Sequence, residues 1–456
     1  MRLTLINQFY TPDLSPTAHL CASLAEHRAA MGDQVTVICG RGGYVQPVAG
    51  SEDRGVRVIR VWTAQLGSRG LLTRLIDWLT FYIVAMFRAA VLPRQDVIVC
   101  LTTPPYIVLA GVIQKLLHPR TRLVLWNMDC YPEALERTGM IRAGGVISDI
   151  MRELNRAIFR RIDHLICLDS AMRELLLSQY APRDRQLACD IISNWERLKL
   201  FPGNEENSPV ARASRPCGTA SSGELLQMAS LLRSNASSTA GTAVPQASIG
   251  AQGSPTAELL QGRFVVLYLG NAGYGHEFAT MLDAAERLRD EPITFLFVGG
   301  GAMRGWIRQQ AKSRGLTNFL FHDYVAKEQT PAVMALADCA LITLENYAAG
   351  VMSPSKLHSN LAMGLPILYI GPTGTNVDEA IGRFGCGASL RPGQPDAVAK
   401  FIRDLMRNRE VCEELRRRAR KAFEDDYCDR RALPCFDQVF AQLLSSPRRH
   451  EATKKC

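Results

Sequence analysis

Short runs of apolar, β-branched and aromatic residues recur along both halves of the chain, and most are followed by a polar loop and a stretch with helical periodicity. Alternation of this kind favours parallel sheets that are covered by helices on both faces. We therefore predict an α/β fold with two doubly wound, Rossmann-like sheets. Ligands bind such sheets at the carboxyl ends of the strands, so the loops that follow the runs are the first candidates for a functional site. The runs lie at residues 3–6, 35–39, 96–101, 122–126 and 165–168, and again at 264–269, 294–298, 318–321, 339–344 and 367–370.

Between the two halves, residues 204–262 are rich in Ser, Ala, Gly, Thr and Pro and nearly lack aromatic residues. Only residues 224–232 have a short helical pattern. A segment of this composition cannot bury enough apolar surface to form a core, so we interpret it as a disordered insertion or linker. The prediction is a first domain at 1–203 and a second domain that begins at 263.

The charge balance favours anionic partners. The chain has 53 Lys and Arg against 44 Asp and Glu, a formal charge of +9. No zinc finger, RNP motif or basic arm is present, so nucleic acid is the weakest of the anionic candidates. The thirteen cysteines form no CxxC pair, and Cys39, Cys100, Cys167 and Cys339 lie inside apolar runs. Together with an N-terminus that does not resemble a signal peptide, they indicate buried thiols in a reducing, cytoplasmic compartment.

The loop between the runs at 339–344 and 367–370 has the composition of a phosphate site. Ser353 or Ser355 can cap a short helix that begins near Lys356 and ends at Gly364, with Pro354 in the turn. Free backbone N–H groups at a helix N-terminus, a hydroxyl and an ammonium group suit a phosphate. The alternative is an ordinary capped helix with a solvated lysine.

Two further loops of the second half are rich in glycine. Gly270, Gly273 and Gly275 follow the run at 264–269, and residues 299–301 are three glycines after the next run. Glycine permits positive φ and close approach of the backbone to a ligand, although the spacing is not GxGxxG and a tight turn is the alternative. His276 and His322 have no HxH or ExxH partner, so the sequence does not predict a metal site.

In the first half, the loop after the first strand contains Tyr10, Ser15 and Thr17, and Asp129 follows the run at 122–126. A carboxylate at that position can be catalytic. The alternative for Asp129 is the N-cap of a helix that begins near Pro132.

Residues 71–92 are the most hydrophobic window of the chain, but Arg74, Asp77 and Arg88 interrupt it. These charges argue against a transmembrane helix. Because the apolar residues occupy more than one stripe, the helix either packs on the sheet or lies in an anionic membrane interface.

Taken together, these motifs resemble those of the family-four retaining glycosyltransferases, in the bacterial branch that builds lipid-linked or capsular polysaccharides. The resemblance rests on Asp129 to Glu133, on Pro354-Ser355-Lys356, and on the segments 268–273, 297–301, 337–341 and 362–366. It implies the GT-B fold, in which two Rossmann-like domains face each other across a cleft. The second domain would span 263–430, and a final helix at 431–448 would return to the first.

The resemblance also implies an activity and roles for particular residues. The enzyme would transfer a hexosyl group from a nucleotide-diphosphate sugar to the hydroxyl of a saccharide or lipid-linked acceptor, with retention and with no cofactor besides the donor. Asp129 and Lys356 would be catalytic, and Tyr10, Ser15 and Thr17 would bind the acceptor. The nucleotide sugar would contact Gly270, Asn271, Gly273, Gly299, Gly300, Tyr324, Val325, Pro354, Ser355, Lys356 and Ser359.

The chain departs from the family at one motif. Two glutamates separated by seven residues usually precede the glycine-proline segment, and here Val351 and Ser359 occupy those positions. Two alternatives therefore remain: a non-catalytic GT-B subunit, or a protein that binds the inner face of the plasma membrane through residues 71–92.

Overall fold

The computed structural model describes residues 1–13, 15–41, 55–64, 71–201, 260, 262–325 and 329–446. Apart from residues 260 and 262, the insertion predicted at 204–262, with its helical patch at 224–232, lies outside the described residues. The chain divides into two compact units. The first unit comprises Met1–Trp195, Ala348–Ser353 and Asp429–Cys456, and the second comprises Glu196–Tyr347 and Pro354–Cys428.

A parallel sheet forms the centre of the first unit, with the strand order β3-β2-β1-β4-β5-β6-β7. The order reverses between β1 and β4, which defines a switch point of the doubly wound kind. Runs such as Leu3 to Ile6 and Val97 to Cys100 are buried throughout, as expected for strands covered on both faces. The strands are β1 (Arg2–Ile6), β2 (Gln34–Gly40), β3 (Val56–Val61), β4 (Val97–Cys100), β5 (Arg122–Trp126), β6 (His164–Cys167) and β7 (Ala188–Ile191).

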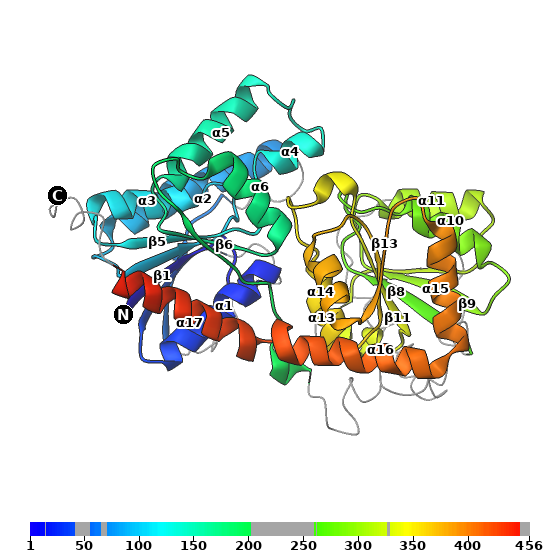
Figure 1. The fold of residues 1–456 in the computed structure, drawn as a ribbon. Helices are drawn as coiled ribbons and strands as arrows, with labels where there is room; N and C mark the ends of the chain where they lie inside the picture. Colours follow the sequence, from blue (N-terminus) through cyan, green and yellow to red (C-terminus); the bar gives the residue numbers. More distant parts are fainter. Residues whose placement is uncertain are drawn as a thin grey trace. The chain divides into compact units, whose positions relative to one another are not determined.

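Helices cover both faces of this sheet. In Figure 1, α2 (Leu71–Val91) and α3 (Val108–Leu117) lie on one face, and α1 (Pro16–Ala30) and α17 (Asp429–Ser445) lie on the other. Helix α17 contacts α1 through Asp437, which accepts a hydrogen bond from Arg28 at 2.7 Å. Its Phe436 packs edge-on against Trp126 of β5, so this helix completes the core. The remaining helices of the unit are α4 (Glu133–Arg137), α5 (Val146–Phe159) and α6 (Ser170–Tyr180).

The second unit has a six-stranded parallel sheet with the order β10-β9-β8-β11-β12-β13, which is the Rossmann order. Its switch point lies between β8 and β11. The strands are β8 (Phe264–Leu269), β9 (Ile293–Val298), β10 (Phe319–His322), β11 (Cys339–Thr343), β12 (Ile367–Ile370) and β13 (Gly387–Leu390).

One core cluster of this unit joins α10, α11 and α15 to the sheet, with Tyr268, Phe278 and Phe297 among its rings. Helix α13 packs against β11, β12 and α16. The helices are α10 (Ala279–Arg287), α11 (Arg304–Ser313), α12 (Thr330–Met334), α13 (Lys356–Ala362), α14 (Asn376–Phe384), α15 (Pro395–Arg407) and α16 (Arg409–Ala422). Short 3-10 helices lie at Leu198–Leu200 and Asn346–Ala348, and a π-helix lies at Phe423–Tyr427.

The predicted α/β class with two doubly wound sheets is confirmed. The edge strands β3 and β13 were not predicted, because half-exposed strands such as Gly387–Leu390 lack a continuous apolar run. Cys39, Cys100, Cys167 and Cys339 are buried free thiols, as predicted.

Candidate functional site

Two glycine turns pack backbone to backbone at the carboxyl ends of β8 and β9 in the second unit. Gly270 follows β8 with φ +123° and Gly299 follows β9 with φ +128°. A Cβ on Gly299 would lie 2.2 Å from the carbonyl oxygen of Gly270. Only glycine fits at Gly299, because both the backbone conformation and the space exclude a side chain.

The hydrogen bonds between these turns use two of the backbone donors of the first turn. The N–H groups of Gly270 and Ala272 donate to the carbonyl oxygens of Val298 and Gly300, at 2.8 and 2.7 Å. Within the described part of the chain, the N–H groups of Asn271 and Gly273 donate no hydrogen bond. Alternate amides of the turn are thus available for an anionic ligand.

Lys356, at the start of α13, reaches this turn. Its Nζ lies 3.4 Å from the carbonyl oxygen of Asn271 and 4.9 Å from the centroid of the Tyr268 ring. Burial lowers the pKa of Lys356 from 10.5 to about 8. Among the described residues no carboxylate forms an ion pair with Lys356. An ammonium group that is held without a counter-ion favours an anionic ligand.

His276 also contacts Lys356, although the sequence analysis assigned it no role. Its Nε2 lies 3.3 Å from Lys356 Nζ, and its Nδ1 lies 2.6 Å from the carbonyl oxygen of Thr343 at the end of β11. Burial, with the Lys356 charge, lowers the pKa of His276 to about 3. His276 has no metal-ligand motif around it, and its hydrogen-bond partners are distant along the chain, so no local pattern indicates its role.

Tyr324 contacts both glycine turns. Its hydroxyl donates to Asn271 Oδ1 at 3.3 Å, and its ring lies against Gly300, where a Cβ would approach within 2.7 Å. The side chain is 60% exposed, so its ring is open to a ligand. Val325 follows as a half-buried residue.

Helix α13 begins at Lys356 and ends before Gly364, as predicted. Ser355 is the N-cap residue of α13, but its side chain makes no capping hydrogen bond. Because α13 has only seven residues, its dipole contributes less than the lysine does. Pro354 is buried, and Ser359 Oγ donates to the carbonyl oxygen of Lys356 at 3.4 Å. The prediction that Ser353 or Ser355 is the N-cap residue is therefore confirmed at Ser355, although its hydroxyl does not satisfy a backbone N–H group.

In the first unit, Asp129 lies in a loop that is fixed by backbone contacts. Thr102 Oγ1 accepts hydrogen bonds from the N–H groups of Met128 and Asp129, at 3.0 and 3.1 Å. Asp129 forms an antiparallel bridge with Met352. Burial raises the pKa of the Asp129 carboxyl to about 6. The alternative that Asp129 caps the next helix is wrong, because Pro132 is the N-cap residue of α4.

Glu133 is a second buried carboxylate in this part of the first unit, and the sequence analysis gave it no role. It is 3% exposed, and its Oε1 accepts a hydrogen bond from the Tyr180 hydroxyl. Its Oε2 has no partner among the described residues. No local motif marks Glu133 as buried, because Tyr180 is 47 residues away.

The three residues expected to bind an acceptor are placed differently from one another. Tyr10 is only 4% exposed and belongs to the core cluster of the first unit, so its ring packs in the hydrophobic core. Ser15 and Thr17 are partly exposed at the start of α1, where their hydroxyls are 2.9 Å apart. Val351, at a position where the family has a glutamate, is buried in the first unit.

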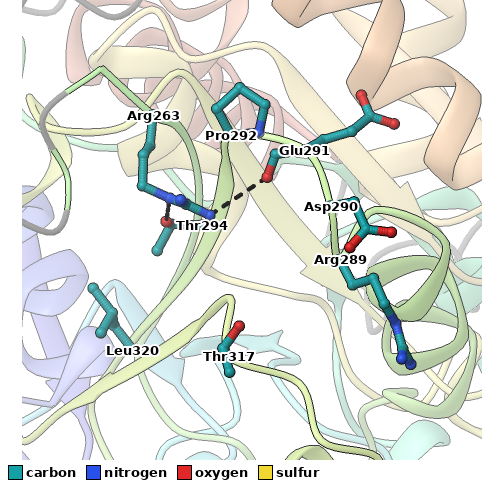
Figure 2. Close-up of a pocket in the computed structure, with 8 residues that line it drawn as sticks. All are labelled: Arg263, Arg289, Asp290, Glu291, Pro292, Thr294, Thr317 and Leu320. Atoms are coloured by element: carbon teal, nitrogen blue, oxygen red, sulfur yellow. Dashed lines mark hydrogen bonds between the residues drawn. The ribbon is translucent and has the colours of Figure 1, made fainter.

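A pocket of about 390 Å³ occurs elsewhere in the second unit, at the amino ends of the strands (Figure 2). Arg263 lines it and donates to Thr294 Oγ1 and to the carbonyl oxygens of Glu291 and Ile293. Ligands of doubly wound sheets bind at the opposite edge, so we assign this pocket no role.

In the part of the chain that the structure describes, no helix is both long enough and apolar enough to cross a membrane. The same residues contain no group of His, Cys, Asp and Glu side chains that could hold a metal ion.

Comparison with known proteins agrees with this architecture. Residues 17–189 match the family described as "Glycosyl transferase 4-like domain", and residues 255–422 match "Glycosyl transferases group 1". The two matches together span most of the chain, which belongs to the family-four glycosyltransferases. The chain shares the GT-B fold with solved structures.

Its relatives include proteins of polysaccharide biosynthesis. WcaI of Escherichia coli K12, a glycosyl transferase assigned to colanic acid biosynthesis, is 30% identical over 150 residues, which is 33% of this chain and 37% of WcaI. The Pseudomonas aeruginosa protein described as "Probable glycosyltransferase WbjE" is 23% identical over 71% of this chain and 69% of its own length. The crystal structure of HepE from Anabaena with UDP and glucose has a TM-score of 0.64 at 13% identity, and the match covers 97% of this chain and all of HepE.

Proposed function

We propose that the protein transfers a hexosyl group from a nucleotide-diphosphate sugar to an acceptor hydroxyl, with retention at the anomeric carbon, and that the acceptor is a lipid-linked or polysaccharide precursor. The observation that carries the proposal is the position of Lys356, an ammonium group that lies at the Gly270–Asn271 turn and pairs with no carboxylate among the described residues. The UDP and glucose complex of HepE supports a nucleotide sugar as the donor. The relatives in polysaccharide biosynthesis support the acceptor class.

The difficult step of such a transfer is the departure of the nucleotide diphosphate. The bond between the anomeric carbon and the diphosphate oxygen breaks, and negative charge develops on the departing phosphate as the acceptor oxygen bonds to the same carbon. Groups that are already oriented toward that charge lower the barrier. Lys356 and the N–H groups of Asn271 and Gly273 are the groups of the second unit that can do so. Asp129, in the first unit, would orient the acceptor or the sugar.

Transfer is tested with the full chain, a set of nucleotide-diphosphate sugars and membrane extracts that contain lipid-linked acceptors. We expect transfer from one donor, and we expect Lys356→Ala to lose at least about 100-fold in rate, the loss typical when a group that stabilises the departing charge is removed. Arg308→Ala, which removes a cation from helix α11 of the same unit, is the matched control. A Lys356→Ala variant as active as the parent would refute the assignment. The anomeric configuration of the product, read by NMR, tests retention.

We also propose that the enzyme docks on an anionic membrane through α2. One face of α2 is buried at Phe81, Ala85 and Ala89, whereas Leu79, Ile83, Phe87 and Val91 form a second apolar stripe at helical spacing, each 58–61% exposed. The neighbouring helix α3 exposes Leu116 and Leu117. An exposed apolar stripe of this size on one helix is typical of an interfacial contact.

The charge around the stripe favours anionic lipid. From Leu71 to Met128 the chain has six Arg or Lys residues and two acidic residues, Asp77 and Asp96. Flotation with vesicles of phosphatidylcholine and phosphatidylglycerol tests the contact, using Ile83→Glu with Phe87→Glu. Phe81 is unsuitable for this test, because it is buried and its substitution would destabilise the first unit. We expect the double variant to bind vesicles at least about tenfold more weakly, since burial of the two exposed side chains on insertion contributes about 3 kcal/mol to the binding free energy. The control is Leu444→Glu on α17, and equal binding by all three proteins would contradict docking through α2.

A further inference from the structure

His276 and Lys356 form a contact in the second unit that joins three elements. His276 is in the loop after β8, its Nδ1 partner Thr343 ends β11, and Lys356 begins α13. The imidazole ring stands edge-on to Tyr268, at 5.9 Å between centroids. Packing and two hydrogen-bonding groups therefore fix the orientation of the ring.

The Thr343 contact determines the tautomer of His276. A carbonyl oxygen can only accept a hydrogen bond, so the short contact at 2.6 Å requires the proton on Nδ1. A protonated Nε2 would then place a second donor against the ammonium of Lys356, which is itself only a donor. The neutral ring with a bare Nε2 is the form that suits both neighbours, and the pKa of about 3 agrees with it.

We infer that His276 is a positioning residue, whose neutral Nε2 accepts a hydrogen bond from Lys356 and holds the ammonium group at the Gly270–Asn271 turn for a nucleoside diphosphate. The inference rests on the proposed function. A neutral acceptor serves this purpose better than a carboxylate would, because it orients the ammonium without cancelling its charge.

The nearby acidic side chains agree with this arrangement. Glu277, the next residue, turns its Oε1 to the N–H and hydroxyl of Thr280, at 2.8 and 3.0 Å. Glu345 contacts the loop through its backbone N–H, which donates to the carbonyl oxygen of Gly275. The acceptors that the structure gives to the ammonium are the carbonyl oxygen of Asn271 and His276 Nε2.

Two substitutions of His276 separate positioning from a structural role. In His276→Gln the side-chain oxygen can occupy the place of Nε2 and still accept from Lys356. In His276→Asn the side-chain amide can occupy the place of Nδ1 and still donate to Thr343, but the acceptor for Lys356 is lost. Binding of UDP, GDP and ADP to the full chain is measured by calorimetry, and the melting temperature without nucleotide reports folding.

We expect His276→Asn to weaken binding of the preferred nucleotide about tenfold and His276→Gln to stay within about threefold of the parent. In a Lys356→Ala background, His276→Asn should have no further effect, because the partner is gone. A purely structural role predicts the opposite order, with the asparagine variant closer to the parent. That order, or an equal loss in the Lys356→Ala background, overturns the inference.

A second measurement does not depend on nucleotide binding. The ¹⁵N NMR signals of the His276 ring in the unliganded protein should show a protonated Nδ1 and an unprotonated Nε2 at neutral pH. A protonated Nε2 overturns the inference even if the enzyme is active. Conversely, a parent protein that has this tautomer but binds none of the nucleotides contradicts the proposed donor site and leaves the contact itself established.

Discussion

Raising the pH should weaken binding of the nucleoside diphosphate through Lys356 alone. Burial lowers the pKa of this group to about 8, so it is about nine-tenths protonated at pH 7 and about one-tenth protonated at pH 9. If the diphosphate binds only the ammonium form, the association constant falls about tenfold between these pH values. The bound anion favours the charged form, so the complex should also take up a proton above about pH 8.

Calorimetry from about pH 7 to 9.5, in two buffers with different ionisation enthalpies, measures both effects. Lys356→Arg is the control, because arginine stays charged throughout, and its affinity should not change over this range. Neither His276, with a pKa of about 3, nor the terminal phosphate of the nucleotide, with a pKa of about 6, titrates in it. A parent protein whose affinity is constant from pH 7 to 9, or falls together with that of the arginine variant, would refute the reasoning.

The loss of affinity above pH 8 cannot arise from destabilisation of the fold by deprotonation of Lys356. The folded-state pKa of Lys356 is lower than its unfolded value of 10.5, so between about pH 8 and 10.5 the unfolded chain binds more protons. The free energy of unfolding of the unliganded protein therefore gains a contribution from this group as pH rises through that window. Affinity and this contribution change in opposite directions.

Three further substitutions test the two units. Gly299→Ala should lower the free energy of unfolding, measured with urea, by more than about 2 kcal/mol and abolish nucleotide binding, because its Cβ would overlap the Gly270 carbonyl. The control is Gly374→Ala, also at positive φ but with nothing within 4 Å of the added Cβ, which should lower the free energy of unfolding by only about 1 kcal/mol. Thr102→Val leaves two backbone donors without their acceptor and should cost about 1–3 kcal/mol in the same assay. Burial raises the pKa of Asp129 to about 6, so its ionised form destabilises the folded protein at pH 7.5, and Asp129→Asn should raise the melting temperature at that pH. This stabilisation, at most about 3 kcal/mol, should disappear below about pH 4. Transfer by Asp129→Asn at pH 7.5 should fall at least about 100-fold. A melting temperature for Asp129→Asn that does not depend on pH, or full transfer by this variant, would contradict that assignment.

The fold class and the candidate donor loops could be predicted from the sequence because their signals are local. Buried parallel strands require continuous apolar runs, and turns with positive φ favour glycine. The strand at residues 264–269 and the turn at Gly270 could therefore be predicted from their own residues. The order of the strands follows from the connection rules of doubly wound sheets, which place the loop after β8 beside the loop after β11.

The roles of single side chains depended on contacts that no local pattern encodes. The periodicity of residues 71–92 showed two apolar stripes, but only packing determined that Phe81 faces the core and that Phe87 faces solvent. His276 and Lys356 are 80 residues apart, and the chain between them sets neither the tautomer of the one nor the pKa of the other. Both properties arise from burial and from the direction of a neighbouring carbonyl group. The sequence by itself therefore determined the two parallel sheets and the edges at which ligands bind, because apolar runs and glycines act over a few residues. Only the tertiary structure decided which polar groups meet at those edges and in which protonation state, because desolvation and hydrogen bonding depend on neighbours that are distant along the chain.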